Sequence, residues 1–219
     1  MSKILVIGAR GRAGRAAIEE ARRRGHEVTG VARRSPELTG VTGVTGSEGG
    51  AGDGELADRI RTGDVTDAAG MAILATGHDA VVAAVYDGSS DPSTFFPAAA
   101  RALVSALEKA AVPRLIWVGL ASILPTANGV LLMDRPGYPQ EYRPFYLAHQ
   151  TVLDIFRSSG LDWVSIAPAG DFDHTEAPRG SYQVAPADAT AQITYADLAV
   201  ALIDEIDHPT HHATAIGVV

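Results

Sequence analysis

The 219-residue chain contains no cysteine. This absence excludes disulfide bridges, thiolate zinc sites, iron–sulfur ligation and thiol nucleophiles. The chain also lacks any run of 18 or more apolar residues, the length that a membrane-spanning helix requires. The first residues, MSKILVIGARG, reach a glycine turn too early for a secretory signal. We therefore expect a soluble, cytoplasmic protein that has no membrane partner.

Positive charge is also scarce in this chain. There are 18 lysines and arginines against 26 aspartates and glutamates, which gives a net charge of −8. Such a balance repels nucleic acid, so we expect no nucleic-acid partner. The hydrophobic content of 46% is enough for one well-buried core. We expect a single domain over residues 1–219.

Apolar runs alternate with segments of helical period along the chain, a pattern typical of a doubly wound, mostly parallel α/β sheet with helices on both faces. The expected strands are 3–7, 27–32, 59–61, 79–85, 114–119, 161–168 and 214–218. The first expected helix follows Gly14 and ends at Gly25, which caps it. Three more helices are expected at 93–110, 142–159 and 196–206. Thr194 and Asp197 resemble a capping box before the last of them.

Three segments show neither the apolar run of a strand nor the period of a helix. The glycine- and threonine-rich stretch at about 35–55 is expected to be a flexible loop. The segments at about 121–141 and 169–192 are rich in turn residues or irregular, and we expect them to form a small substrate-side region. The helices at 93–110 and 142–159 are the candidates for the face of a homodimer.

The motif GARGRAG, residues 8–14, follows the first strand and opens the first helix. In a dinucleotide site, Gly8 permits the tight turn, Gly11 lets the backbone approach a pyrophosphate, and Gly14 lets helix and sheet pack closely. The helix amino terminus attracts the anion. A purely structural turn is the alternative, but the strand–turn–helix context favours a dinucleotide. The candidate cofactor residues in the motif are Gly8, Arg10, Gly11, Arg12, Ala13 and Gly14.

The residues after the second strand indicate which dinucleotide binds. NAD sites carry an acidic side chain there for the ribose hydroxyls, whereas this chain has Arg33 and Arg34. A guanidinium suits the 2′-phosphate of NADP(H), and Arg10 could reach the same group. Solvated surface arginines are the alternative interpretation. We predict NADP(H) as the cofactor.

Seven motifs are spread over nearly the whole chain: VIGARGRAG (6–14), VARR (31–34), GDVTD (63–67), DAVVAAV (79–85), RLIWVGLAS (114–122), SSGLDWVSIAP (158–168) and ITYADLA (193–199). With these motifs the chain resembles the atypical short-chain dehydrogenases/reductases that carry an NAD(P)H-binding Rossmann domain. It is similar in particular to the flavin reductase/biliverdin reductase B relatives, and the nitrogen-regulator-like sensors share that fold.

The resemblance implies roles for residues outside the glycine motif. Asp64 and Val65 would flank the adenine, and Ala83 and Ala84 would pass behind the ribose and pyrophosphate. Ser122 would lie beside the nicotinamide. Pro168, at the end of the strand expected over 161–168, is a further candidate cofactor-binding residue.

Three side chains are candidates for the chemistry. Ser122 could donate to the oxygen that gains negative charge during hydride transfer, although a serine at a strand end is often an ordinary turn residue. Tyr146 could donate as well, but Gln150 stands where the wider superfamily has the lysine of Tyr-x-x-x-Lys. His149 shares a helix face with apolar residues and should point inward, either to the site or as a core histidine bonded to a carbonyl.

Other features restrict the substrate. Tyr138, Tyr142, Phe145 and Tyr146 could stack on a planar substrate or simply pack a helix. Where the flavin reductase relatives have a histidine after the sixth strand, this chain has Ala169-Gly170-Asp171, and only His174 follows. The carboxyl-terminal HPTHH (208–212) lacks the spacing and accompanying ligands of a metal site, so we expect no metal.

These observations favour an NADPH-dependent reductase acting on a small planar molecule such as a quinone, a flavin or a conjugated ketone. Two alternatives stay open. One is a non-catalytic redox sensor that binds NADP(H). The other is an epimerase or dehydratase that keeps its cofactor.

Overall fold

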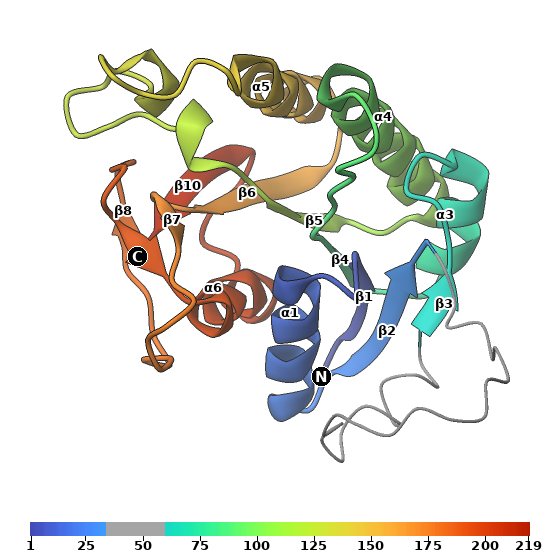
Figure 1. Ribbon diagram of the computed structural model, residues 1–219. Helices are drawn as coiled ribbons and strands as arrows, with labels where there is room; N and C mark the ends of the chain where they lie inside the picture. Colours follow the sequence, from blue (N-terminus) through green and yellow to red (C-terminus); the bar gives the residue numbers. More distant parts are fainter. Residues whose placement is uncertain (34–59) are drawn as a thin grey trace, which may run out of the picture.

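The computed structural model describes residues 1–33 and 60–219. Its centre is an eight-stranded sheet in the order β3-β2-β1-β4-β5-β6-β10-β8 (Figure 1), parallel throughout except for the β10–β8 pair. The strands are β1 (Lys3–Ile7), β2 (Glu27–Ala32), β3 (Ile60–Thr62), β4 (Ala80–Ala83), β5 (Arg114–Val118), β6 (Asp162–Pro168), β8 (Val184–Ala185) and β10 (Thr214–Val218). A second, two-stranded parallel sheet pairs β7 (Asp171–Phe172) with β9 (Gln192–Ile193).

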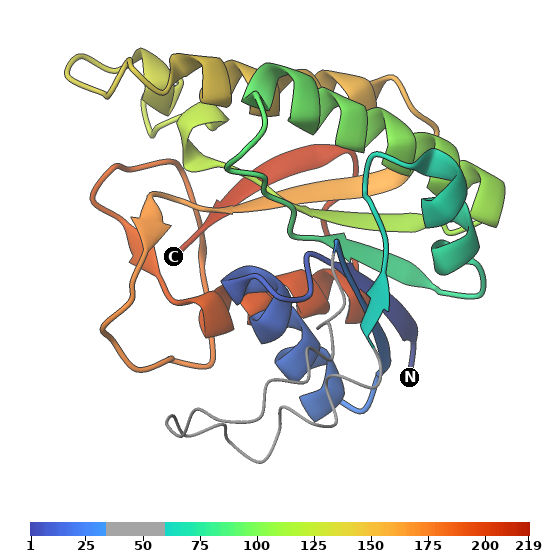
Figure 2. The same cartoon turned by 45° about the vertical axis from the view of Figure 1, so that its right-hand side comes forward.

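Helices cover both faces of the main sheet, as Figures 1 and 2 show. On one face lie α3 (Ala68–Ala75), α4 (Pro92–Ala110) and α5 (Arg143–Arg157), and on the other α1 (Arg12–Arg23) and α6 (Tyr195–Asp207). Two short 3₁₀ helices, η1 (Ala121–Ile123) and η2 (Leu132–Asp134), follow β5. The predicted doubly wound α/β fold is confirmed.

The central strand β1 shows why the sheet is buried on both sides. Leu5 and Ile7 belong to the core beneath α3, α4 and α5, whereas Ile4 and Val6 belong to the core beneath α1 and α6. All four side chains are at most 3% exposed. Strand β1 lies between β2 and β4, so the strand order reverses at its carboxyl end. Doubly wound sheets bind ligands at this point.

One helix and two short strands were not predicted from the sequence. Residues 68–75 form α3, which the sequence analysis does not predict because AAGMAILA has no polar face. Asp67 begins this helix by accepting hydrogen bonds of 3.1 Å from the amides of Ala69 and Gly70. The segment 169–192, expected to be irregular, contains β7 and β8. These two-residue strands depend on distant partners, which a local pattern does not reveal.

Other boundaries shift only slightly. The strand expected over 79–85 ends at Ala83, and the one expected over 59–61 covers 60–62. The glycine- and threonine-rich stretch at 35–55 lies outside the described residues. Within 1–33 and 60–219, no helix is long and apolar enough to cross a bilayer.

The capping box before α6 is present in a modified form. Thr194 Oγ1 accepts a hydrogen bond from the Asp197 amide at 3.1 Å, as the sequence predicts. The Asp197 carboxylate, however, accepts hydrogen bonds from the Thr194 hydroxyl and from the amides of Arg179 and Gly180. It therefore fastens the segment before β8 to the start of α6.

Candidate functional site

The turn between β1 and α1 requires two of its three glycines. Gly8 has φ +84°, and a Cβ there would lie 1.9 Å from the carbonyl oxygen of Ala84. A Cβ on Gly14 would lie 2.2 Å from the carbonyl oxygen of Gly8. Gly11 is less constrained. It begins α1 without any side-chain cap, which leaves the first amides of the helix free to bind an anion.

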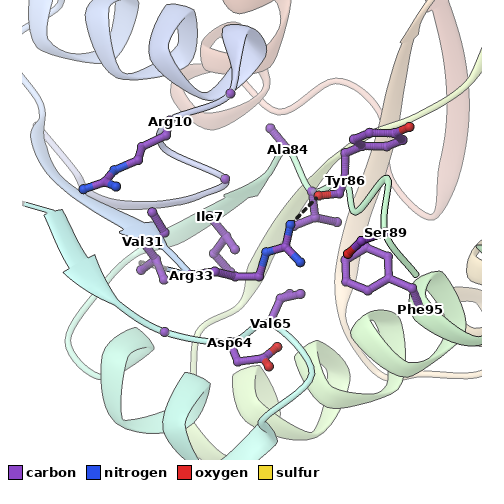
Figure 3. A pocket seen from close by; sticks show the side chains of 15 residues that line it. Ile7, Arg10, Val31, Arg33, Asp64, Val65, Ala84, Tyr86, Ser89 and Phe95 are labelled. Atoms are coloured by element: carbon purple, nitrogen blue, oxygen red, sulfur yellow. Dashed lines mark hydrogen bonds between the residues drawn. The ribbon is translucent and has the colours of Figure 1, made fainter. Parts of the chain in front are cut away.

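A cavity of about 670 Å³ opens beside this turn at the carboxyl ends of β1, β2 and β4 (Figure 3). Seven of the predicted cofactor residues line it: Gly8, Arg10, Gly11, Arg33, Asp64, Val65 and Ala84. The remaining lining residues are Ile7, Val31, Ala32, Gly63, Val85, Tyr86, Ser89 and Phe95. The structure therefore brings together segments that lie up to about 85 residues apart in the sequence around one nucleotide-sized space.

The other predicted cofactor residues lie elsewhere. Ala83 is buried in β4, and Pro168 is buried at the end of β6 opposite Val218; neither lines this cavity. Arg12 begins α1, and its guanidinium lies 3.4 Å from His174 Nδ1 and 6.0 Å from the centre of the Tyr195 ring. Arg12 therefore leans away from the cavity. Ala13 and Gly14 form the first turn of α1, and Arg34 lies outside the described residues.

Asp64 and Val65 shape the cavity floor after β3. The Asp64 carboxylate accepts hydrogen bonds from the Thr66 amide at 2.9 Å and from the Thr66 hydroxyl at 2.8 Å. These bonds fix the turn that presents the Val65 side chain, which is 4% exposed. The arrangement offers an apolar floor and a polar edge, which suits the flat face and the amino group of a purine.

A second cavity of about 670 Å³ lies at the carboxyl end of β5, and Tyr86 lines both cavities. Its walls are mainly apolar and aromatic. They comprise Tyr86, Pro92, Leu120, Ala121, Ser122, Tyr138, Glu141, Tyr142, Pro144, Phe145, Tyr146, Gly170, Asp171 and Ala189. Among the residues that the structure describes, this lining includes two carboxylates and no lysine or arginine. The whole aromatic group expected from the sequence therefore faces one space.

Hydroxyl groups gather on one wall of the second cavity. Ser122 Oγ and Tyr138 Oη share a hydrogen bond of 2.9 Å, and the Tyr138 and Tyr146 rings lie 5.5 Å apart. Burial raises the pKa of the Tyr146 phenol above its ordinary value. The Tyr146 phenol is therefore protonated at neutral pH, and the hydroxyl groups on this wall can donate hydrogen bonds to a ligand oxygen. Tyr138 was not predicted as Ser122's partner, because the two residues are 16 positions apart in a segment without a regular pattern.

His149 points inward, as its helix face predicts, but it lines neither cavity. Its ring lies 4.1 Å from Phe96 and 4.8 Å from Phe145, measured between ring centres. Neither ring nitrogen has a hydrogen-bond partner among the described residues, so the predicted carbonyl partner is also missing. Burial lowers the pKa of His149 to about 3.

Replacing His149 with phenylalanine is expected to make the protein less sensitive to acid. The unfolded histidine, with a pKa of about 6.5, binds a proton that the folded one refuses until about pH 3. Wild-type stability therefore falls as the pH drops below about 6.5, by about 1.4 kcal/mol per pH unit from this group. Between pH 7.5 and pH 4.5, urea unfolding should show that His149→Phe loses about 3 kcal/mol less stability than the wild type does.

The control for this experiment is the exposed His208, replaced in the same way. His208→Phe should lose as much stability between the two pH values as the wild type does. An equal acid loss in His149→Phe and the wild type would show that His149 is protonated in the folded protein.

The carboxyl-terminal histidines have a structural role. His211 Nδ1 lies 2.6 Å from Glu205 Oε1, and His212 Nδ1 lies 2.8 Å from Asp162 Oδ1, at the sheet edge where β6 begins. Among the described residues, no group of three or more histidines, aspartates and glutamates could hold a metal ion.

Sequence reasoning missed two further residues. Tyr86 and Asp87 follow β4 at the carboxyl edge of the sheet; Tyr86 joins the cavities, and Asp87 pairs with Arg33 at 2.5 Å. Their position directly after a buried parallel strand was the available signal.

Comparisons with known proteins agree with this geometry. The chain is 33% identical to the uncharacterized protein YwnB of Bacillus subtilis (strain 168), over 95% of this chain and 94% of that protein. A solved structure of a candidate NADH-flavin reductase from Streptococcus pneumoniae TIGR4 is 28% identical with a TM-score of 0.79, covering 100% of this chain and 99% of the other. A candidate epimerase from Bacteroides thetaiotaomicron is 27% identical with a TM-score of 0.77, covering 99% and 96%.

The family model of NAD(P)H-binding proteins matches residues 8–209. The match begins at the first glycine of GARGRAG and extends through α6, so it includes every residue that lines the two cavities except Ile7. The chain belongs to the NAD(P)H-binding family.

Proposed function

We propose that the protein is an NADPH-dependent reductase that passes hydride to a small planar molecule such as a quinone, a flavin or a conjugated ketone. The observation that carries this proposal is the hydroxyl pair of Ser122 and Tyr138 in an aromatic cavity that adjoins the nucleotide cavity at Tyr86. A hydride acceptor needs this arrangement, with a flat apolar space beside the cofactor and a donor for its oxygen.

The residues present fit a nicotinamide dinucleotide. The tight turn at Gly8 and Gly11 and the free amides of α1 suit the pyrophosphate, and the space over Val65 suits the adenine. Arg33 and Arg10 supply positive charge at the adenosine end, which supports NADPH over NADH. NADPH, when bound, supplies the hydride from C4 of its nicotinamide ring.

The chain itself positions the substrate and stabilises its charge. For a conjugated ketone, hydride adds to the β-carbon. The electron pair of the carbon–carbon double bond then forms the double bond of the enolate, and the π electron pair of the carbonyl group moves to its oxygen. Ser122 or Tyr138 would donate a hydrogen bond to that oxygen as it becomes negative, and a proton from solvent completes the product. Tyr142 and Phe145 would hold the plane of the substrate. The lining without lysine or arginine favours uncharged substrates over anionic ones.

Replacing Ser122 with alanine is expected to lower kcat/KM for NADPH oxidation by about 100-fold, the usual effect of losing one donor to a developing oxyanion. The dissociation constant of NADPH should not change, because Ser122 lies in the second cavity. The measurement is the absorbance of NADPH with a panel of quinones, flavins and enones, together with a fluorescence titration of NADPH.

The control is Ser158→Ala, which removes an exposed hydroxyl at the end of α5 that donates to the carbonyl of Ile155. It should keep full activity. Unchanged turnover in Ser122→Ala would exclude Ser122 as the donor, and no turnover of any substrate by the wild type would overturn the proposal.

The redox sensor is the second candidate function, and the lysine content favours it. The chain has two lysines, Lys3 and Lys109. Lys3 begins β1 and Lys109 lies in the last turn of α4, so both are at the sheet edge opposite the cavities. No lysine can therefore tune Tyr146 as an acid. A sensor would bind NADPH and NADP⁺ with different affinities and oxidise no NADPH.

Cytoplasmic location and the homodimer stay predictions.

A further inference from the structure

Asp87 is a nearly buried carboxylate beside the first cavity. It lines a smaller cavity of about 450 Å³ that shares Arg33 and Asp64 with the first. It follows β4 and is 9% exposed. Its Oδ1 accepts hydrogen bonds from the amide and the hydroxyl of Ser89, at 3.0 and 2.6 Å, and its Oδ2 accepts one from the hydroxyl of Ser90 at 2.7 Å. These hydrogen bonds hold the pKa of Asp87 well below its ordinary value, and the bond from the Ser89 hydroxyl has the largest effect. The residue is a fixed negative charge.

This charge is paired with the arginine that would recognise the 2′-phosphate. Arg33 NH1 lies 2.5 Å from Asp87 Oδ2, and Arg33 NH2 donates to the carbonyl oxygen of Tyr86 at 3.4 Å. Figure 3 shows the Arg33 side chain extending across the cavity from the β2 side toward Tyr86, with that bond drawn. About half of the Arg33 side chain is exposed, whereas Asp87 is covered. The arginine is thus the partner that can move.

We propose that Asp87 weakens the selectivity for NADPH over NADH by occupying Arg33 and by repelling the 2′-phosphate. This inference rests on the proposed function. A phosphate that binds the same guanidinium comes close to the Asp87 carboxylate, and like charges at short range repel strongly inside a protein. NADH carries a hydroxyl at that position and is not repelled. Asp87 therefore lowers the affinity for NADPH and leaves the affinity for NADH unchanged.

The test is the dissociation constants of NADPH and NADH, measured by the fluorescence of Trp117 and Trp163, for wild type and Asp87→Asn. Asparagine has the same shape and can keep the bonds from Ser89. We expect Asp87→Asn to bind NADPH about tenfold more tightly, as removal of one close like charge should. NADH affinity should change less than about twofold, since it has no charge there.

A double-mutant cycle with Arg33→Gln tests whether the effect passes through Arg33. In the Arg33→Gln background, Asp87→Asn should increase the affinity for NADPH by less, because no guanidinium is left for it to release. Ser90→Ala, which removes a bond to Asp87 but no charge, is the matched control and should leave the selectivity unchanged. If Asp87→Asn does not fold, Asp87→Ser, neutral and smaller, carries the same expectation.

An unchanged ratio of the two dissociation constants in a folded Asp87→Asn would overturn the inference. So would weaker NADPH binding, which would mean that Asp87 positions Arg33 for the phosphate. Either result leaves the proposed reductase intact. A wild-type protein that binds neither dinucleotide would instead overturn the proposed function itself.

Discussion

Replacing Gly8 with alanine should lower the free energy of unfolding by about 3 kcal/mol. The backbone at Gly8 has φ +84°, which strains any residue with a Cβ. The new methyl group would also lie 1.9 Å from the carbonyl oxygen of Ala84, which is backbone and cannot rotate away. The turn must therefore move away from β4, and NADPH binding should weaken by at least about tenfold. Urea unfolding and a fluorescence titration measure the two effects.

Gly25 offers a matched control, because it has nearly the same backbone angle without the contact. Its φ is +83°, and no atom lies within 4 Å of a Cβ built there. Gly25→Ala should therefore cost only about 1 kcal/mol and leave NADPH affinity unchanged. Equal losses of stability in the two variants would show that the close approach of Gly8 to Ala84 does not matter.

Replacing Arg114 with leucine is expected to destabilise the protein by about 3–5 kcal/mol, because it leaves a buried carboxylate without its cation. Arg114 is 6% exposed and Glu205 is 2% exposed, and the two pair at 2.8 Å. Arg114 also donates to Asp162 at 2.8 Å and to the carbonyl oxygen of His211 at 3.0 Å. The cluster joins β5, β6 and α6 at the edge away from both cavities.

The control is the exposed pair of Arg157 and Asp154, which lie 2.7 Å apart with side chains 57% and 67% exposed. Arg157→Leu should cost less than about 1 kcal/mol. Both variants should keep the wild-type selectivity between NADPH and NADH, because neither residue is near the nucleotide cavity. A loss in Arg114→Leu no larger than that in Arg157→Leu would contradict a stabilising role for the buried pair.

Local sequence patterns predicted those parts of the fold that local patterns determine. The strand–glycine–helix order of residues 3–23 follows from an apolar run, a turn that tolerates positive φ and a helical period. Helix α3 was missed because AAGMAILA is apolar on all sides. Strands β7 and β8 were missed because two residues carry no period, and their pairing with β9 and β10 is decided by distant segments.

The same distinction holds for the candidate site. Ser122 could be placed at the sheet's carboxyl edge because it follows a buried parallel strand, and the family resemblance assigned it a role. Its partner Tyr138 comes from an irregular loop, and Arg33 meets Asp87 across 54 residues. No spacing in the sequence encodes these contacts. For His149, the helical face predicted the burial but not the absence of a partner.

Hydride transfer to a substrate is tested by following deuterium from NADPH labelled at C4 of the nicotinamide to a conjugated ketone. The protein and labelled NADPH are mixed with the ketone without oxygen, and the product is analysed by mass spectrometry. We expect one deuterium on the β-carbon of the product, and much slower formation with Ser122→Ala. NADPH that binds tightly but is not consumed, with ketones, quinones and flavins all tried, would contradict the reductase and favour the sensor.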